Sequence, residues 1–330
     1  MIFFFIWIGM EMISLLLLGF LFLKKSLKIN GIGFQKMGVL VKYMFIQIIS
    51  GMVIFFSFIL SSFLFDVFKL GYSLGSNTEN GFYMIEWLFK FMFFFSIFMK
   101  LGLFPGHLWV IDIFSGLSQQ ECFLLGIIPK YAPFMLLTGF NYDIFLTCVG
   151  TLSILSGSFI GLNYTDIRQI MGGSSIMNTG WLLMGMVYGG LGVFLFMYVI
   201  YSLSVWLMFT FTENLGIQSL VLHNLSRMEK MMFCLLMFII MGMPCGIMFF
   251  FKIFLIMNGG NFFFFTFLML MGYTMFVFYS RTMSQVWNYD YRNIHFNIST
   301  LSSNNSIKSR YVMSLVMMNF SGMIILFKFL

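Results

Sequence analysis

The stretch LGVFLFMYVIYSLSVWLMFTF (191–211) contains no charged side chain and is long enough to cross the hydrocarbon core of a membrane as a helix. Comparable stretches recur along the chain of 330 residues, of which 60% are hydrophobic, 21% aromatic and only 9% charged. A soluble globular domain carries about 25% charged residues. We therefore expect this chain to fold inside a bilayer, with little room for a domain in water.

The apolar stretches predict an all-α, polytopic membrane protein with about ten transmembrane helices in a single transmembrane domain, 1–330. Long, uniformly apolar segments satisfy their backbone hydrogen bonds as helices, whereas a barrel would show short alternating strands. The predicted spans lie at 2–23, 39–65, 83–103, 121–140, 143–163, 170–188, 191–211, 231–257, 262–281 and 311–329.

Several kinds of site find no support in the sequence. The four cysteines stand singly and the three histidines lie far apart, so neither a metal site nor an iron-sulfur cluster is indicated. No glycine-rich phosphate loop follows a strand-like run. The net charge of +7 is spread too thinly to form a nucleic-acid patch. We expect no metal, cofactor or nucleic acid to bind within this chain, and we expect its apolar faces to meet lipid.

Four ionisable residues stand out because charge in the hydrocarbon region is costly, at least about 2.5 kcal/mol per group. Glu11 and Lys130 each lie close to the middle of a span, beyond the reach of a side chain that extends to the membrane surface. Lys100 and Lys252 lie nearer to span ends, and for them such an extension to the surface stays open. Glu11 and Lys130 must face protein or water.

All four prolines lie close to these lysines. Pro105 follows Lys100, Pro129 and Pro133 flank Lys130, and Pro244 precedes Lys252 by eight residues. Proline removes a helix hydrogen bond, which lipid does not tolerate unless other groups compensate. Proline-broken helices beside buried charges are typical of ion paths in transporters, so the pattern predicts a polar route through the bundle.

Lysine is well suited to carrying protons, because burial favours its neutral form and a nearby carboxylate favours its charged form. Glu11 could supply that carboxylate. His107, just after Pro105, is either a proton relay at the rim of the membrane or an interfacial histidine beside Trp109.

Six motifs, in order along the chain, resemble those of the mitochondrial NADH-ubiquinone oxidoreductase chain 2 family, an antiporter-like membrane-arm subunit of respiratory complex I. They are WIGMEM (7–12), KYMFIQ (42–47), KLGLFPGHLWV (100–110), KYAP (130–133), GLNYTDIRQIMGGSSIMNTGW (161–181) and GMPCGIMFFFK (242–252). Some positions depart from the family pattern: Asn178 replaces a frequent histidine, Cys245 replaces the second proline of a pair, and Ile111-Asp112 replaces a Pro-Glu pair. The family also usually has one helix before its glutamate helix, and here the glutamate comes at residue 11.

The resemblance implies a proton-translocation path built from Glu11, its paired Lys100, the central Lys130 on a broken helix and the terminal Lys252 on a second one. It also implies that NADH, FMN, iron-sulfur clusters and ubiquinone are bound by partner subunits, so that this chain is an enzyme subunit without redox chemistry of its own. Its partners would be the other subunits of complex I, and it would not act as a stand-alone monomer.

The composition points to the same cellular location. Phe (48) and Met (32) are abundant while Ala occurs once, which indicates AT-rich coding typical of an organelle genome or of a bacterial endosymbiont. The expected location is the mitochondrial inner membrane. Two rival functions stay open: a stand-alone cation/proton antiporter, and a purely structural membrane subunit whose charges only fix helix packing.

Overall fold

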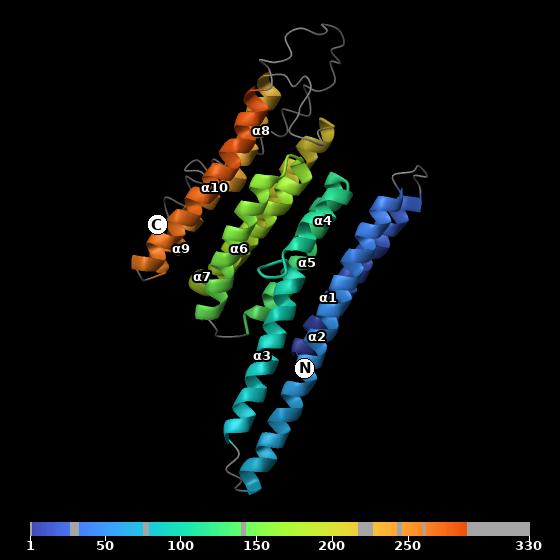
Figure 1. The fold of residues 1–330 in the computed structure, drawn as a ribbon, viewed down its shortest axis with the longest axis vertical. Helices are drawn as coiled ribbons and strands as arrows, with labels where there is room; N and C mark the ends of the chain where they lie inside the picture. Colours follow the sequence, from blue (N-terminus) through green and yellow to red (C-terminus); the bar gives the residue numbers. More distant parts are fainter. Residues whose placement is uncertain are drawn as a thin grey trace. The chain divides into compact units, whose positions relative to one another are not determined.

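The described part of the chain is built from α-helices. The computed structural model describes residues 2–26, 33–74, 79–139, 143–216, 227–242, 246–259 and 262–288 (Figure 1). Its helices confirm the predicted all-α fold; the span predicted at 311–329 lies outside the described residues. The helices are α1 Ile2–Ser26, α2 Gly33–Leu74, α3 Glu79–Leu101, α4 Leu108–Gly116, α5 Gln119–Leu137, α6 Asp143–Asn163, α7 Ile167–Asn214, α8 Arg227–Met241, α9 Ile247–Asn258 and α10 Phe262–Asn288.

The chain divides into two compact units. Unit 1 comprises Met1–Leu117 and Leu124–Phe140, and so holds α1 to α4 and most of α5. Unit 2 comprises Ser118–Phe123 and Asn141–Leu330, and so holds α6 to α10. The single transmembrane domain over 1–330 stays a prediction.

The core of unit 1 is a helix layer in which α2 packs against α1, α3 and α4. One stripe of α2 is buried and recurs every three or four residues, as a helix face should. Phe58 on this helix meets Phe93 of α3 edge to face, with ring centroids 5.1 Å apart. The members of the buried stripe are Leu40, Tyr43, Gln47, Ser50, Gly51, Ile54 and Ser57.

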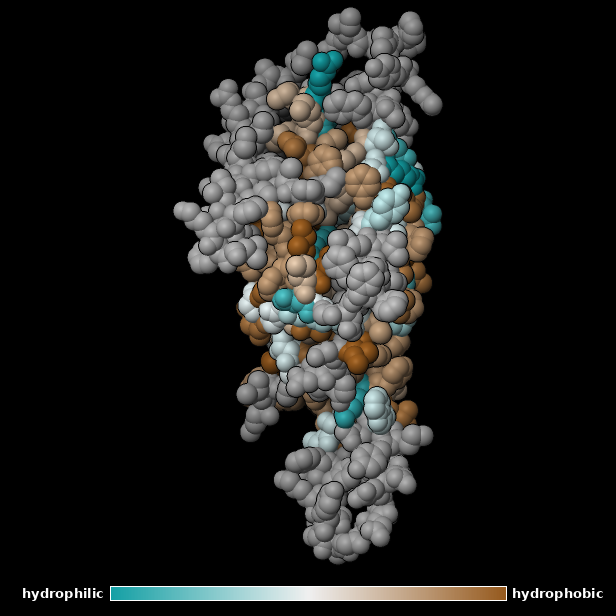
Figure 2. Space-filling model, turned by 90° about the vertical axis from the view of Figure 1, so that its left-hand side faces the viewer, coloured by the Kyte–Doolittle hydropathy of each residue, from teal (hydrophilic) through white to brown (hydrophobic). Residues whose placement is uncertain are grey.

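Large apolar side chains are also exposed on helices of both units, and brown areas mark apolar residues on the face drawn in Figure 2. On α1, for example, Phe5 and Leu16 are exposed while Met10 and Leu18 are buried. Within the described ranges, four helices (α1, α2, α6 and α7) are long and apolar enough to cross a membrane. The chain is therefore a membrane protein whose exposed apolar faces suit lipid.

Helix α7 covers two of the predicted spans, 170–188 and 191–211, and the chain turns back between them. Gly190 has φ +73° and ψ −178°, a conformation that is not helical and that glycine adopts readily. A Cβ placed on Gly185 would lie 2.8 Å from the Met197 sulfur, although these residues would be about 18 Å apart along a straight helix. The two halves of α7 thus pack on each other as separate passes.

The predicted span 231–257 is occupied by two helices, α8 and α9. Helix α8 ends at Met241 and is followed by Gly242 with φ +76°, which stops the helix. Helix α5 differs from the expected broken helix, because it continues from Gln119 to Leu137 with Pro129 and Pro133 inside it. Each proline lacks an amide hydrogen but leaves the φ and ψ of a helix accessible, so a helix held by packing can pass through both.

Candidate proton-path site

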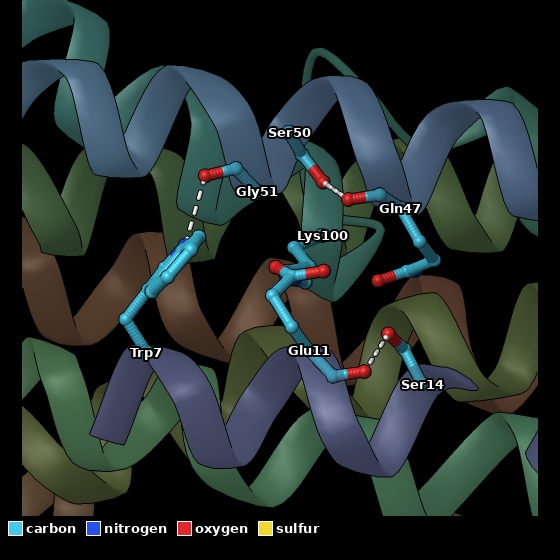
Figure 3. Close-up of polar contacts among 7 residues, drawn as sticks. All are labelled: Trp7, Glu11, Ser14, Gln47, Ser50, Gly51 and Lys100. Carbon is cyan, nitrogen blue, oxygen red and sulfur yellow. Dashed lines mark hydrogen bonds and ion pairs between the residues drawn. The ribbon is translucent and has the colours of Figure 1, made fainter. Parts of the chain in front are cut away.

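Glu11 and Lys100 form a partly buried ion pair in unit 1. The Lys100 ammonium donates a hydrogen bond to the Glu11 carboxylate, which brings together residues of α1 and α3 (Figure 3). The Lys100 side chain is only 2% exposed and that of Glu11 is 21% exposed. Lys100 therefore points into its unit and does not extend to the surface. The buried lysine depends on its partner, because without Glu11 its charge would be left uncompensated inside the helix bundle.

Contacts around Glu11 hold α1 against α2. The Trp7 indole nitrogen donates to the Gly51 carbonyl at 2.9 Å, and the Ser14 hydroxyl donates to the Glu11 carbonyl at 2.8 Å (Figure 3). The Trp7 ring also stacks on Phe55, with centroids 4.6 Å apart. Gly51 lets the carboxylate approach the α2 backbone, since a Cβ there would overlap the Glu11 carboxylate. A larger residue at position 51 would therefore displace the Glu11 carboxylate.

Lys100 lies in the last turn of α3, where a cation is favoured by the helix dipole. The end of this helix is held by Trp109 of α4, whose indole nitrogen donates to the Met99 carbonyl at 2.9 Å. The Trp109 ring in turn lies 6.0 Å from that of Tyr43 on α2. The aromatic pair therefore connects α2, α3 and α4 next to the lysine.

Lys252 of α9 is held inside unit 2. Its ammonium donates to the Met241 carbonyl at 2.6 Å and lies 3.6 Å from the Met275 sulfur. The ammonium also lies 5.2 Å from the centroid of the Trp181 ring, within the range of a cation–π interaction. The Trp181 indole nitrogen donates to the same Met275 sulfur at 3.0 Å. Lys252 is 8% exposed, so it too points inward and does not reach the surface.

The other two predicted residues are buried as well. Lys130 lies between the two prolines of α5 and is 3% exposed. His107 precedes α4, is 8% exposed and stacks on Phe104 with ring centroids 5.9 Å apart. Burial lowers the pKa of His107 below its usual value. His107 is therefore a packed residue of the α3–α4 loop, and its role as a relay stays a prediction.

A second ion pair in unit 1 joins Lys42 of α2 to Asp112 of α4 at 3.1 Å. Both side chains are exposed, 61% for the lysine and 59% for the aspartate. Such a pair contributes little to stability and does not resemble the enclosed Glu11–Lys100 pair.

Comparison with known proteins places this arrangement in a family. The family described as NADH:quinone oxidoreductase/Mrp antiporter, TM matches residues 2–278. The chain belongs to this family. The match covers both described units up to Phe278 of α10, and so includes Glu11, Lys100, Lys130 and Lys252.

Two individual proteins are similar to this chain over part of its length. NADH-ubiquinone oxidoreductase chain 2 of Pisaster ochraceus is 37% identical over 142 residues, which cover 41% of this chain and 38% of the relative. Chain 2 of Albinaria caerulea is 28% identical over 217 residues, 63% of this chain and 66% of the relative. The chain thus spans less than two thirds of the length of either relative. These matches confirm the resemblance found in the sequence.

A solved structure shows the shared fold of the NADH:quinone oxidoreductase/Mrp antiporter family. A chain of respiratory complex I from Thermus thermophilus superimposes with a TM-score of 0.67, covering 96% of this chain and 71% of that one. Its sequence identity is only 16%, so the similarity lies in the fold.

Some residues of the site were not predicted from the sequence. Trp181, Met241 and Met275 surround Lys252 from three helices, and Gly51 accommodates Glu11 from α2. Only the Gly-Trp pair at 180–181 offered a signal, because a lone tryptophan beside a glycine stands out in an apolar span. Among the described residues, no group of three His, Cys, Asp or Glu side chains is placed to hold a metal ion.

Proposed function

We propose that this chain is a core membrane-arm subunit of a proton-pumping NADH:ubiquinone oxidoreductase in the mitochondrial inner membrane. The observation that carries the proposal is the Glu11–Lys100 pair between two apolar helices, with the lysine side chain only 2% exposed, because ionisable groups within membrane spans are costly and mark ion pathways. The names of the relatives and the family match support the same assignment.

In this proposal the chain moves protons by electrostatic coupling and makes or breaks no covalent bond other than those to protons. A change of charge that starts at the quinone-binding end of the complex alters the pairing of Glu11 with Lys100. That change shifts the balance between the charged and neutral forms of Lys130, and a proton then moves toward Lys252. The redox chemistry, the NADH site and the electron carriers belong to partner subunits.

The test is the substitution Lys130→Met, with Lys42→Met as the matched control. Both remove a lysine from a helix of unit 1, but Lys130 is buried and Lys42 is exposed beside Asp112. We expect the assembled complex with Lys130→Met to lose proton transport per NADH oxidised, while the complex with Lys42→Met keeps it. Full transport by the assembled Lys130→Met complex would refute the role proposed for this lysine.

Two other outcomes distinguish the rival functions. Cation-dependent proton exchange by the isolated chain in liposomes would favour a stand-alone antiporter, which the family description also includes. A loss of assembly, with unchanged proton transport in whatever complex does assemble, would favour a purely structural subunit.

A further inference from the structure

Gln47 has an unusual environment for an amide side chain. It belongs to the buried stripe of α2 and is only 1% exposed, yet within the described ranges neither its amide nitrogen nor its amide oxygen has a hydrogen-bond partner. Burying an unpaired amide costs free energy, and such groups are uncommon in folded proteins. The unpaired amide of Gln47 therefore points to a functional role for this residue.

The position of Gln47 points to the ion pair. Gln47 and Gly51 are four residues apart on one helix and so share a face, and Gly51 is where the Glu11 carboxylate touches α2. Figure 3 shows the Gln47 side chain extending from α2 toward the space beside Glu11 and Lys100. The amide thus lies on the face of α2 that the Glu11 carboxylate touches.

Tyr43 extends the same face by one further turn. Its hydroxyl is also buried, with no hydrogen-bond partner among the residues that the structure describes. An amide nitrogen and a phenol are both hydrogen-bond donors. Two unsatisfied donors on the face of α2 that touches a carboxylate form an environment suited to an anion.

This inference rests on the proposed function, in which the Glu11–Lys100 pair changes during each cycle. When such a pair opens, the carboxylate loses its donor while it is still inside the bundle, and it needs another. We propose that Gln47 is the positioning residue that receives the Glu11 carboxylate when its pair with Lys100 opens, with the Tyr43 hydroxyl as a second donor. The side chain of Glu11 then has two resting places, one on Lys100 and one on α2.

The test compares Gln47→Met with Ser57→Ala in the assembled complex. Methionine has a similar length to glutamine but cannot donate to a carboxylate. Ser57 is the matched control, because it lies in the same buried stripe and its hydroxyl donates to the Ile54 carbonyl of its own helix at 2.7 Å. We expect Gln47→Met to slow NADH-driven proton transport roughly tenfold, the effect of losing one hydrogen bond to a charged group. Ser57→Ala should leave transport unchanged.

A spectroscopic measurement separates positioning from packing. The infrared band of the Glu11 carboxylate, identified by its loss in Glu11→Gln, should shift when NADH reduces the complex. We expect Gln47→Met to abolish this shift. Transport equal to that of Ser57→Ala, or an unchanged shift, would overturn the proposal. So would failure of both Gln47→Met and Gln47→Leu to assemble while Ser57→Ala assembles, since Gln47 would then serve folding.

Lys130→Met, measured in parallel, distinguishes the two proposals. If Lys130→Met keeps full transport, the proposed function fails. If Lys130→Met abolishes transport while the Gln47 variants keep it, only the inference about Gln47 fails.

Discussion

Replacing Gly51 by alanine should separate Glu11 from Lys100 without removing either charge. The added methyl group would lie 2.6 Å from Glu11 Cδ and 3.0 Å from Oε2. Carbon atoms in contact prefer a separation of about 3.5–4.0 Å, so the carboxylate must retreat by about 1 Å. Because Gly51 lies in the middle of α2, which packs against three other helices, we expect the Glu11 side chain to give way before the backbone does.

The size of the effect follows from this displacement. Moving two opposite charges from about 3 Å to about 4 Å apart weakens their attraction by about 1.4 kcal/mol at an effective dielectric constant of about 20. This attraction is part of the charge-assisted hydrogen bond, whose complete loss costs about 1.5–3 kcal/mol, or roughly a tenfold to hundredfold change in the fraction of paired residues. We expect proton transport per NADH to fall while the chain still assembles, because alanine favours a helix more than glycine does.

Gly38→Ala is the matched control for this experiment. Gly38 also lies in α2, but a Cβ there would have no atom within 4 Å. Both variants should be measured as assembled complexes reconstituted in liposomes, with NADH oxidation and proton uptake recorded together. Equal transport by Gly51→Ala and Gly38→Ala would refute the argument that the Glu11 carboxylate depends on its approach to α2.

Three further predictions concern other parts of the molecule. Met275→Leu should lower the stability of the chain by about 1 kcal/mol in a tryptophan-fluorescence unfolding assay, because it leaves the buried Trp181 indole nitrogen without its sulfur acceptor. An unchanged free energy of unfolding would contradict the contact. Lys42→Met should change stability by less than about 1 kcal/mol in the same assay, because its pair with Asp112 is exposed; a loss of several times that size would show a structural role. The third prediction concerns His107, whose NMR resonance in a histidine-labelled sample is identified by its loss in His107→Gln. This resonance should titrate below about pH 6.5, because burial disfavours the imidazolium and its proton is therefore lost at a lower pH than in the unfolded chain. Titration at or above that pH would refute the effect of burial.

The sequence predicted the charged residues of the site better than their surroundings. Glu11 and Lys130 stood out because a charge in the middle of an apolar span is rare, a property that depends only on residue type and position in the chain. Gly51 and Met275 could not be found this way, since glycine and methionine are ordinary residues in an apolar helix. Their roles come from contacts between helices far apart in the sequence.

The helix ends were also only partly predictable from the sequence. The break before Lys252 was expected from Pro244, and α8 does end at Met241. Pro129 and Pro133 predicted a break in α5 as well, but α5 continues through both of them. The difference depends on how neighbouring helices and side chains compensate for a missing amide hydrogen, which a single sequence does not encode locally.

The contact between Lys252 and the Met241 carbonyl has a further consequence. In an unbroken helix that carbonyl would accept from a backbone amide, a group that keeps its proton under all physiological conditions. Here the last carbonyl of α8 accepts from an ammonium group, which can give its proton away. The last carbonyl of α8 is thus bound by a titratable donor, so in the proposed function a change in proton occupancy at Lys252 would act directly on the main chain.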